Sequence, residues 1–188
     1  DEPLSALDAK VRATLRDEIR QVQRSLEIPT LMVTHDQEEA LALADKIICM
    51  NHGIVVQAGT PEDLYHRPAT RFVAEFMGSS NLLSTQEVRQ HFPELMSTCP
   101  ADNKTYLACI RPEQIVLTPD QNGTATVRNI SFLGNLQRLE VDSPAGPLLV
   151  ETHGRAPCGT GDTVDLSIAS QACTWVLDDV DQPKTVTA

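Results

Sequence analysis

His35 is the residue of this sequence whose surroundings most clearly suggest a ligand-binding role. It follows residues 30–34, a run of β-branched and apolar side chains that predicts a short buried strand. Asp36 can cap a helix, and Glu39 lies three residues further on, at the spacing of a capping box. We therefore expect His35 between the carboxyl end of a strand and the start of a helix, where open α/β sheets bind ligands. The alternative is a structural histidine in an ordinary loop.

A second group of polar residues opens the chain. Asp1 and Glu2 are adjacent carboxylates followed by Pro3, and a Ser-Ala-Leu-Asp segment runs from Ser5 to Asp8. Either Ser5 or Asp8 can cap the helix that is predicted next. None of these short motifs indicates a function by itself.

The helix expected after Asp8 carries one apolar stripe, whose members recur every three or four residues. The stripe consists of Val11, Leu15, Ile19, Val22 and Leu26. Arg12, Arg16, Arg20 and Arg24 lie mostly off it. We expect these arginines to form a solvated face of mixed charge, in preference to a basic binding face. Pro29 is expected to end the helix.

Residues 36–80 predict short helices and strands in alternation. Two apolar runs separated by Asn51, His52 and Gly53 predict a β-hairpin with a tight turn. Thr60 followed by Pro61 predicts a helix start. The expected elements are helices after Asp36, after Thr60 and near Phe72, and strands at 46–50 and 54–58. The small polar residues at 78–81 break this pattern and predict a boundary between domains at 1–80 and 81–188.

Residues 81–188 have a different texture, with short alternating apolar runs between Gly- and Pro-containing turns. This pattern predicts an all-β domain, a small barrel or sandwich, with a short helix near 87–92. The expected strands are 106–110, 115–117, 123–132, 136–141, 148–151, 163–168 and 174–177.

Composition limits the classes of function. The chain has 188 residues and a net charge of −11, with an acidic excess in both halves, so nucleic acid is not an expected partner. Five cysteines without a C-x-x-C pair predict neither a disulfide framework nor a zinc site, and fit a reducing cytoplasm. No apolar run reaches the roughly 18 residues of a membrane span, and no signal peptide is expected.

The order of the motifs is more specific than any one of them. Asp1-Glu2-Pro3, the segment from Ser5 to Asp8, a helix, and a run ending in Thr34-His35-Asp36 resemble the second half of the nucleotide-binding subunit of ABC transporters. The likeness continues through 44–47, 53–61 and 72–78, and thus covers residues 1–78. It implies an α/β fold, the C-terminal half of a P-loop nucleotide-binding domain, followed by the all-β domain.

The resemblance also implies roles. Asp1 would end the Walker B strand and hold Mg²⁺, while Glu2 would polarise the attacking water. Ser5 and Asp8 would belong to the D-loop, at the interface with a second nucleotide-binding domain. His35 would contact the γ-phosphate of ATP. These residue types suit phosphoryl transfer, which needs charge neutralisation and a positioned water more than covalent catalysis.

The chain departs from this family in what it lacks. It contains no G-x-x-x-x-G-K-[S/T] sequence, no Gly-rich signature and no glutamine loop. Without a P-loop there is neither a backbone cradle nor a lysine for the phosphates. We therefore expect this chain to be the C-terminal part of a longer ATPase, and the 188 residues alone not to bind ATP usefully.

Arg111-Pro112-Glu113 and Phe132-Leu133-Gly134-Asn135 resemble stretches of the transport-associated OB (TOBE) domain. Importers for sugars, sulfate, polyamines, ferric iron and phosphonates carry such domains. The structural interpretation of Arg111 is a surface turn that leaves a strand.

The function implied is that of the ATP-hydrolysing subunit of an ABC importer. It would act as a homodimer with permease subunits, at the cytoplasmic face of the membrane. The alternative is a regulatory or small-molecule-binding module in residues 81–188, with a small molecule or a protein as regulator. A nucleic-acid-binding OB protein is disfavoured, because the region is acidic and has few aromatic residues.

Overall fold

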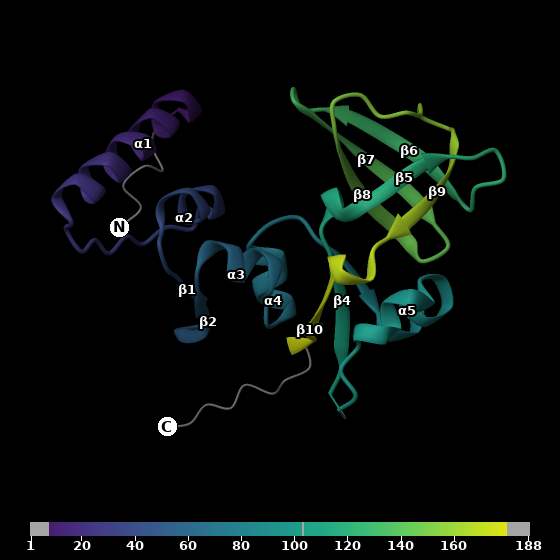
Figure 1. Ribbon diagram of the computed structural model, residues 1–188, viewed down its shortest axis with the longest axis horizontal. Helices are drawn as coiled ribbons and strands as arrows, with labels where there is room; N and C mark the ends of the chain where they lie inside the picture. The colour runs from purple at the N-terminus through teal and green to yellow at the C-terminus, as the bar shows by residue number, and fades with distance from the viewer. Residues whose placement is uncertain (1–7, 103, 180–188) are drawn as a thin grey trace. The chain divides into compact units, whose positions relative to one another are not determined.

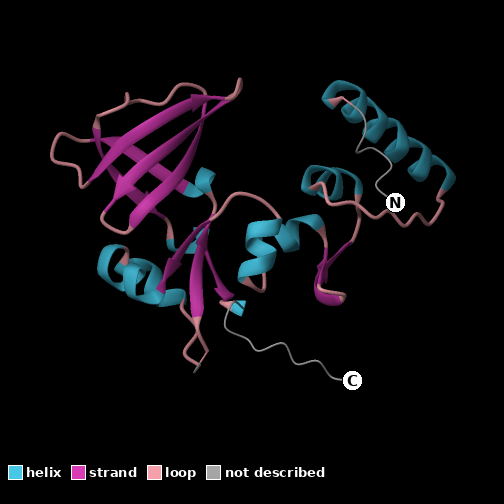
Figure 2. Cartoon of the chain, turned by 180° about the vertical axis from the view of Figure 1, so that it is seen from behind, coloured by secondary structure: helices cyan, strands magenta, loops and turns pink. Residues whose placement is uncertain are grey.

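The computed structural model describes residues 8–102 and 104–179. They form two compact units, one of residues up to 67 together with 76–78, and one of residues 68–75 together with those from 79 onward. The first unit mixes helices with a small hairpin, and the second is rich in strands (Figures 1 and 2). This agrees with the α/β part followed by an all-β part that the sequence predicts.

α1 (Ala9–Leu26) is the helix expected after Asp8. Of the two candidate caps, Asp8 is the N-cap, since its Oδ1 accepts hydrogen bonds from the amides of Lys10 (3.1 Å) and Val11 (3.0 Å). The helix ends at Glu27, which takes the left-handed conformation with φ 50°. The position of this helix was thus predicted correctly, and the structure decides between the two candidate caps in favour of Asp8.

The strand predicted for residues 30–34 is wrong. This segment is irregular, and the side chains of Leu31 and Val33 are 89% and 55% exposed. A strand requires a neighbour whose N–H and C=O groups complete its hydrogen bonds, and no described strand runs beside this segment. The β-branched and apolar residues of this run are typical of a buried strand. A strand also needs a neighbouring strand to pair with, and the residue types of the run itself do not reveal whether one is present.

The remaining elements of the first unit follow the prediction closely. α2 (Gln37–Leu43) starts after Asp36, and β1 (Ile47–Asn51) pairs antiparallel with β2 (Ile54–Gly59). His52 and Gly53 both have positive φ, 49° and 79°, as a two-residue hairpin turn of type I′ requires. α3 (Pro61–His66) begins with a capping box between Thr60 and Asp63.

Two antiparallel sheets build the second unit (Figure 2). The three-stranded sheet has the order β10 (Cys173–Leu177), β4 (Tyr106–Ile110), β3 (Asn81–Ser84). The five-stranded sheet has the order β5 (Ile115–Pro119), β9 (Thr163–Ile168), β6 (Ala125–Phe132), β7 (Leu136–Ser143), β8 (Gly146–His153). All seven strands predicted for this region are present. The sequence did not predict β3, because it begins at Asn81, inside the polar run that was expected to be a break.

One hydrophobic core joins the two sheets. Leu83 of β3, Ile110 of β4 and Leu139 of β7 are buried in it, together with Val88 of α5 (Thr85–His91). The edge strands of the five-stranded sheet, β5 and β8, contact each other, so this sheet curls toward a closed barrel. Short turns of 3₁₀ helix connect these elements at Pro93–Thr98, Pro112–Gln114 and Ser170–Ala172.

The start of α4 (Arg71–Phe76) belongs to the second unit. The amide of Leu177 donates to the carbonyl of Ala69 (3.1 Å), and the amide of Phe72 donates to Asp179 Oδ1 (3.2 Å). These bonds attach residues 68–75 to the end of β10. The domain boundary placed after residue 80 stays a prediction.

Candidate functional site

The predicted site residues fall into two groups. Asp1, Glu2 and Ser5 lie outside the described residues, and only Asp8 and His35 can be placed. Asp8 is exposed, and its carboxylate caps α1. His35 is also exposed, and it occupies a bend between an irregular segment and α2. The structure therefore keeps His35 at a helix start, as expected, but without the predicted strand before it.

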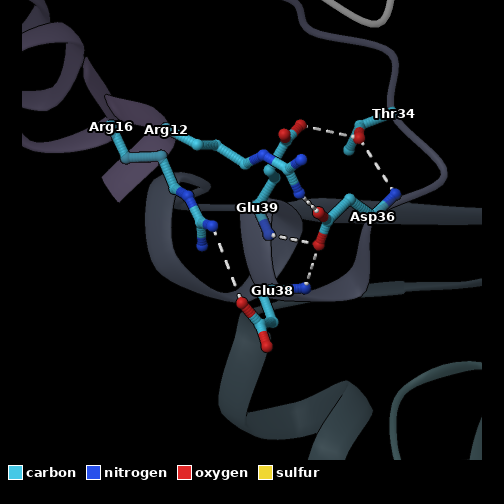
Figure 3. A network of polar contacts seen from close by, with 6 residues as sticks. All are labelled: Arg12, Arg16, Thr34, Asp36, Glu38 and Glu39. Carbon is cyan, nitrogen blue, oxygen red and sulfur yellow. Dashed lines mark hydrogen bonds and ion pairs between the residues drawn. The ribbon is translucent and has the colours of Figure 1, made fainter. Parts of the chain in front are cut away.

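Hydrogen bonds of the residues on either side of His35 close the turn, and Figure 3 shows two of these residues, Thr34 and Asp36. The amide of Asp36 donates to the hydroxyl oxygen of Thr34 (3.0 Å), and that hydroxyl donates to Glu39 Oε2 (2.8 Å). The expected capping box is therefore modified. The Glu39 carboxylate reaches Asp36 through the Thr34 hydroxyl, where a capping box would have a direct bond to the amide. Thr34 carries this role, and the sequence prediction had assigned it only to a strand.

Asp36 uses both carboxylate oxygens. Its Oδ1 accepts from the amides of Glu38 (2.8 Å) and Glu39 (3.2 Å), and its Oδ2 accepts from Arg12 Nη1 (2.9 Å). Partial burial raises the pKa of Asp36, but the two amide hydrogen bonds, the charge of Arg16 and the bond from Arg12 outweigh it. The net pKa of this carboxyl group lies below its ordinary value.

The solvated face expected for the α1 arginines is wrong for three of the four, since only Arg24 is exposed. The side chain of Arg16 is 14% exposed and pairs with Glu38 at 3.6 Å (Figure 3). Arg20 Nη1 donates to the last carbonyls of α2, those of Ala42 (2.7 Å) and Leu43 (2.8 Å). Arg12, Arg16 and Arg20 are four residues apart on one helix face, and each bonds to α2 or its cap.

The arginines of α1 bond to α2 because the two helices carry complementary hydrogen-bonding groups. α2 and its cap offer carboxylates at one end and unpaired carbonyls at the other, and arginine can bond to both. The apolar stripe of α1 is accordingly left in part to solvent, with Val11, Val22 and Leu26 exposed by 42%, 55% and 60%.

In the second unit, Arg111 is a buried residue, so the surface-turn interpretation is wrong. It is 2% exposed, and its Nη1 donates to the carbonyls of Ala74 (3.0 Å) and Ser79 (3.2 Å) and to Ser80 Oγ (2.5 Å). Burial of a guanidinium is tolerated because these oxygens satisfy it. Arg111 thus fixes the chain between α4 and β3.

Asn81 is a second buried polar residue, and no feature of the sequence indicates its role. It is 6% exposed, and its side-chain amide bonds to the main chain of Leu149 and also to the carbonyl of Ile110 (3.4 Å). A small polar residue after two serines is typical of a loop, and only the folded chain brings β8 beside it.

The described residues, 8–102 and 104–179, contain no cluster of three or more His, Cys, Asp or Glu side chains that could hold a metal ion. None of the helices within these same ranges combines the length and the apolar character needed to cross a bilayer.

Known proteins match this chain in both its first and its second part. Residues 108–176 match the TOBE domain family. A sulfate/thiosulfate import ATP-binding protein, CysA 2 of Chromobacterium violaceum, is 41% identical over 162 residues, which are 80% of this chain and 44% of that protein. The spermidine/putrescine import ATP-binding protein PotA of Borreliella afzelii is 42% identical over 71% of this chain and 41% of its own length.

An Fe(3+) ions import ATP-binding protein, FbpC of Escherichia coli K12, is 36% identical over 82% of this chain and 44% of its own length. The chain spans less than half the length of these relatives. The fold and these matches define a homologue of the ATP-binding subunits of ABC importers. Within it, residues 108–176 form a TOBE domain.

Proposed function

We propose that this chain is part of the ATP-hydrolysing subunit of an ABC importer, which couples ATP hydrolysis to the uptake of a solute. The observation that carries the proposal is the exposed position of His35 in a braced turn. It lies in a chain that matches import ATP-binding proteins over about 80% of its length. An exposed imidazole of this kind can donate an N–H to a phosphate oxygen.

The residues would divide the work as follows. Asp1 would hold Mg²⁺, because magnesium prefers carboxylate and water oxygens, and Glu2 would orient the attacking water. Ser5 and Asp8 would face the second subunit, and His35 would contact the γ-phosphate. When bound, ATP and Mg²⁺ supply the transferable phosphoryl group and part of the charge neutralisation.

The partners follow from the proposed role. A second copy of the subunit would complete the nucleotide site, and permease subunits would attach the ATPase to the inner face of the cell membrane. The TOBE domain at 108–176 is the part available for a small-molecule or protein regulator, as the alternative function requires. The relatives are named for sulfate or thiosulfate, for spermidine or putrescine, and for ferric ions, so their names do not converge on one cargo.

The test is the substitution His35→Ala in the complete subunit, with His153→Ala as the matched control. His153 is also exposed, and it lies at the end of β8 in the second unit. We expect His35→Ala to abolish ATP turnover and His153→Ala to leave it unchanged. Turnover at the wild-type rate in His35→Ala would refute the proposed role.

A further inference from the structure

Glu39 is an unusual residue for its surroundings. It lies on α2, whose other glutamate, Glu38, has a side chain that is 77% exposed, yet Glu39 itself is only 1% exposed. Its Oε2 accepts the hydroxyl hydrogen of Thr34 at 2.8 Å, while its Oε1 makes no hydrogen bond with any described residue. Burying a carboxylate with one oxygen unsatisfied is costly, so this placement requires an explanation beyond helix formation.

The explanation lies in what the Thr34 hydroxyl does. A hydroxyl group has one hydrogen to donate and two lone pairs to accept with. In Thr34 the hydrogen goes to Glu39, and this fixes the rotation of the hydroxyl so that a lone pair can receive the Asp36 amide at 3.0 Å. The bond from the Asp36 amide closes a small ring over the backbone of His35, the one residue between Thr34 and Asp36, and the bond to Glu39 holds the hydroxyl in place.

Asp36, the residue after His35, is also held by several hydrogen bonds. Asp36 accepts two α2 amides with Oδ1 and the Arg12 guanidinium with Oδ2. The residues before and after His35 are therefore both fixed by side-chain hydrogen bonds, while His35 itself remains exposed to solvent. This arrangement presents an imidazole on a rigid backbone without burying it, as a group that must meet a ligand requires.

We propose that Glu39 is a positioning residue for His35, which it orients through the hydroxyl of Thr34. Glu39 touches neither substrate nor phosphate. Its role is to keep the His35 backbone where the imidazole meets the phosphate, because displacements of about 1 Å in such contacts cost up to roughly a hundredfold in rate. This inference rests on the proposed function of His35, and the experiments below separate the two.

The first experiment measures ATP turnover in the complete subunit. Thr34→Val removes the hydroxyl at nearly constant shape, and we expect kcat to fall roughly tenfold to a hundredfold with a smaller change in KM. Thr34→Ser keeps the hydroxyl and should restore most of the rate. Glu38→Gln, on the same helix and exposed, is the control and should behave as the wild type. An unchanged kcat in Thr34→Val would overturn the inference.

The second comparison sets the single variants His35→Ala and Thr34→Val side by side in the complete subunit. We expect His35→Ala to abolish turnover and Thr34→Val to leave a reduced but measurable rate, because Thr34 acts on the phosphate contact only through His35. If His35→Ala alone turned over normally, the proposed function would fail. If His35→Ala were inactive while Thr34→Val was normal, only the present inference would fail.

A third measurement does not depend on activity. In the 188-residue chain, amide hydrogen exchange at Asp36 reports the bond to Thr34 directly. We expect Thr34→Val and Glu39→Ala each to accelerate this exchange about fivefold to tenfold, the factor that one hydrogen bond is worth, and Glu38→Gln to leave it unchanged. Equal exchange rates in Glu39→Ala and in the wild type would contradict the link between Glu39 and the turn.

Discussion

The side chain of Asn81 and the main chain of Leu149, 68 residues apart, exchange two hydrogen bonds. The Leu149 amide donates to Asn81 Oδ1 (2.7 Å), and Asn81 Nδ2 donates to the Leu149 carbonyl (2.8 Å). Asn81 lies on β3 and Leu149 on β8, so one asparagine side chain bonds to the outer edge of the five-stranded sheet as another strand would. Within the second unit, this residue links the two sheets beside their common core.

Replacing Asn81 should therefore destabilise the second unit. Asn81→Ala leaves an N–H and a C=O of β8 without partners in a partly buried place, and we expect a loss of about 2 kcal/mol in the free energy of unfolding. This loss can be measured by chemical denaturation, with the fluorescence of Trp175 as the signal, because Trp175 lies in this unit on β10. Asn129→Ala, at an exposed position of β6, is the matched control and should change stability by less than about 0.5 kcal/mol.

Arg111 should be equally sensitive to substitution. Arg111→Met removes donors to the carbonyls of Ala74 and Ser79, and we expect a loss of roughly 3 kcal/mol, since bonds from a charged donor are among the stronger ones. Arg128→Met is the control. Arg128 pairs with Asp142 across β6 and β7, but its side chain is 61% exposed, so its removal should cost at most about 1 kcal/mol. Equal losses in the two variants would show that burial of Arg111 is not what matters.

Asp36 should give the first unit a defined dependence on pH. Its pKa is lowered in the folded chain, so the unfolded chain binds the proton more tightly. The stabilisation is then complete above the ordinary pKa of an aspartate, about 4, and is lost as the pH falls through the lower folded value. Titration of the Asp36 carboxyl carbon by NMR measures the shift directly.

In Asp36→Asn, the stability of the first unit should change less between pH 6 and pH 3 than it does in the wild type. Asp45→Asn serves as the control, since the Asp45 side chain is 73% exposed and its contact with Arg20 is long, at 4.0 Å. A normal carboxyl pKa for Asp36 would contradict the combined effect of the two α2 amides, the charge of Arg16 and the bond from Arg12.

The cysteines should differ in reactivity. Burial, with smaller effects from Cys109 and Cys99, raises the pKa of Cys173 to about 12, so almost none of it is thiolate at pH 8. Cys99 and Cys158 are only partly buried. We expect a thiol reagent at pH 8 to label Cys99 and Cys158 first, and Cys173 only after denaturation, with mass spectrometry of peptides as the measurement. Early labelling of Cys173 would mean that β10 opens readily.

Nucleotide binding by the 188-residue chain should be negligible. The sequence has no P-loop to cradle the phosphates, and His35 alone provides too few contacts. Calorimetry with Mg-ATP is expected to give no measurable heat of binding. Micromolar affinity in this experiment would contradict the proposal that the phosphate site needs further parts of the subunit.

Local chemistry allowed much of the fold to be predicted from the sequence. The expected bounds of β4 and β9 agree with the structure, because strands in the second unit alternate between buried and exposed positions and end at Gly- and Pro-containing turns. Asp36 and Thr60 were recognised as caps, and Asp8 as one of two candidates, because a cap acts within three residues of itself. The hairpin turn at His52 and Gly53 is local in the same sense.

What could not be predicted depends on distant partners. The irregular conformation of residues 30–34 follows from the absence of a neighbouring described strand, and a residue's own type does not reveal that. Arg12 meets Asp36 across 24 residues, and Arg111 meets Ala74 across 37. Likewise, the sequence places Thr34 in a β-branched run, and only the folded chain shows that its hydroxyl donates to Glu39.

The way in which Arg111 holds its neighbours has a consequence for how this region can diverge. Arg111 donates to the backbone carbonyl of Ser79, and the side chain of Ser79 is exposed. Many residue types at position 79 would therefore preserve this hydrogen bond. Arg111 itself has no such freedom, because no other side chain offers the same planar set of donors. Among relatives that keep this joint, position 111 should hold one residue while position 79 varies.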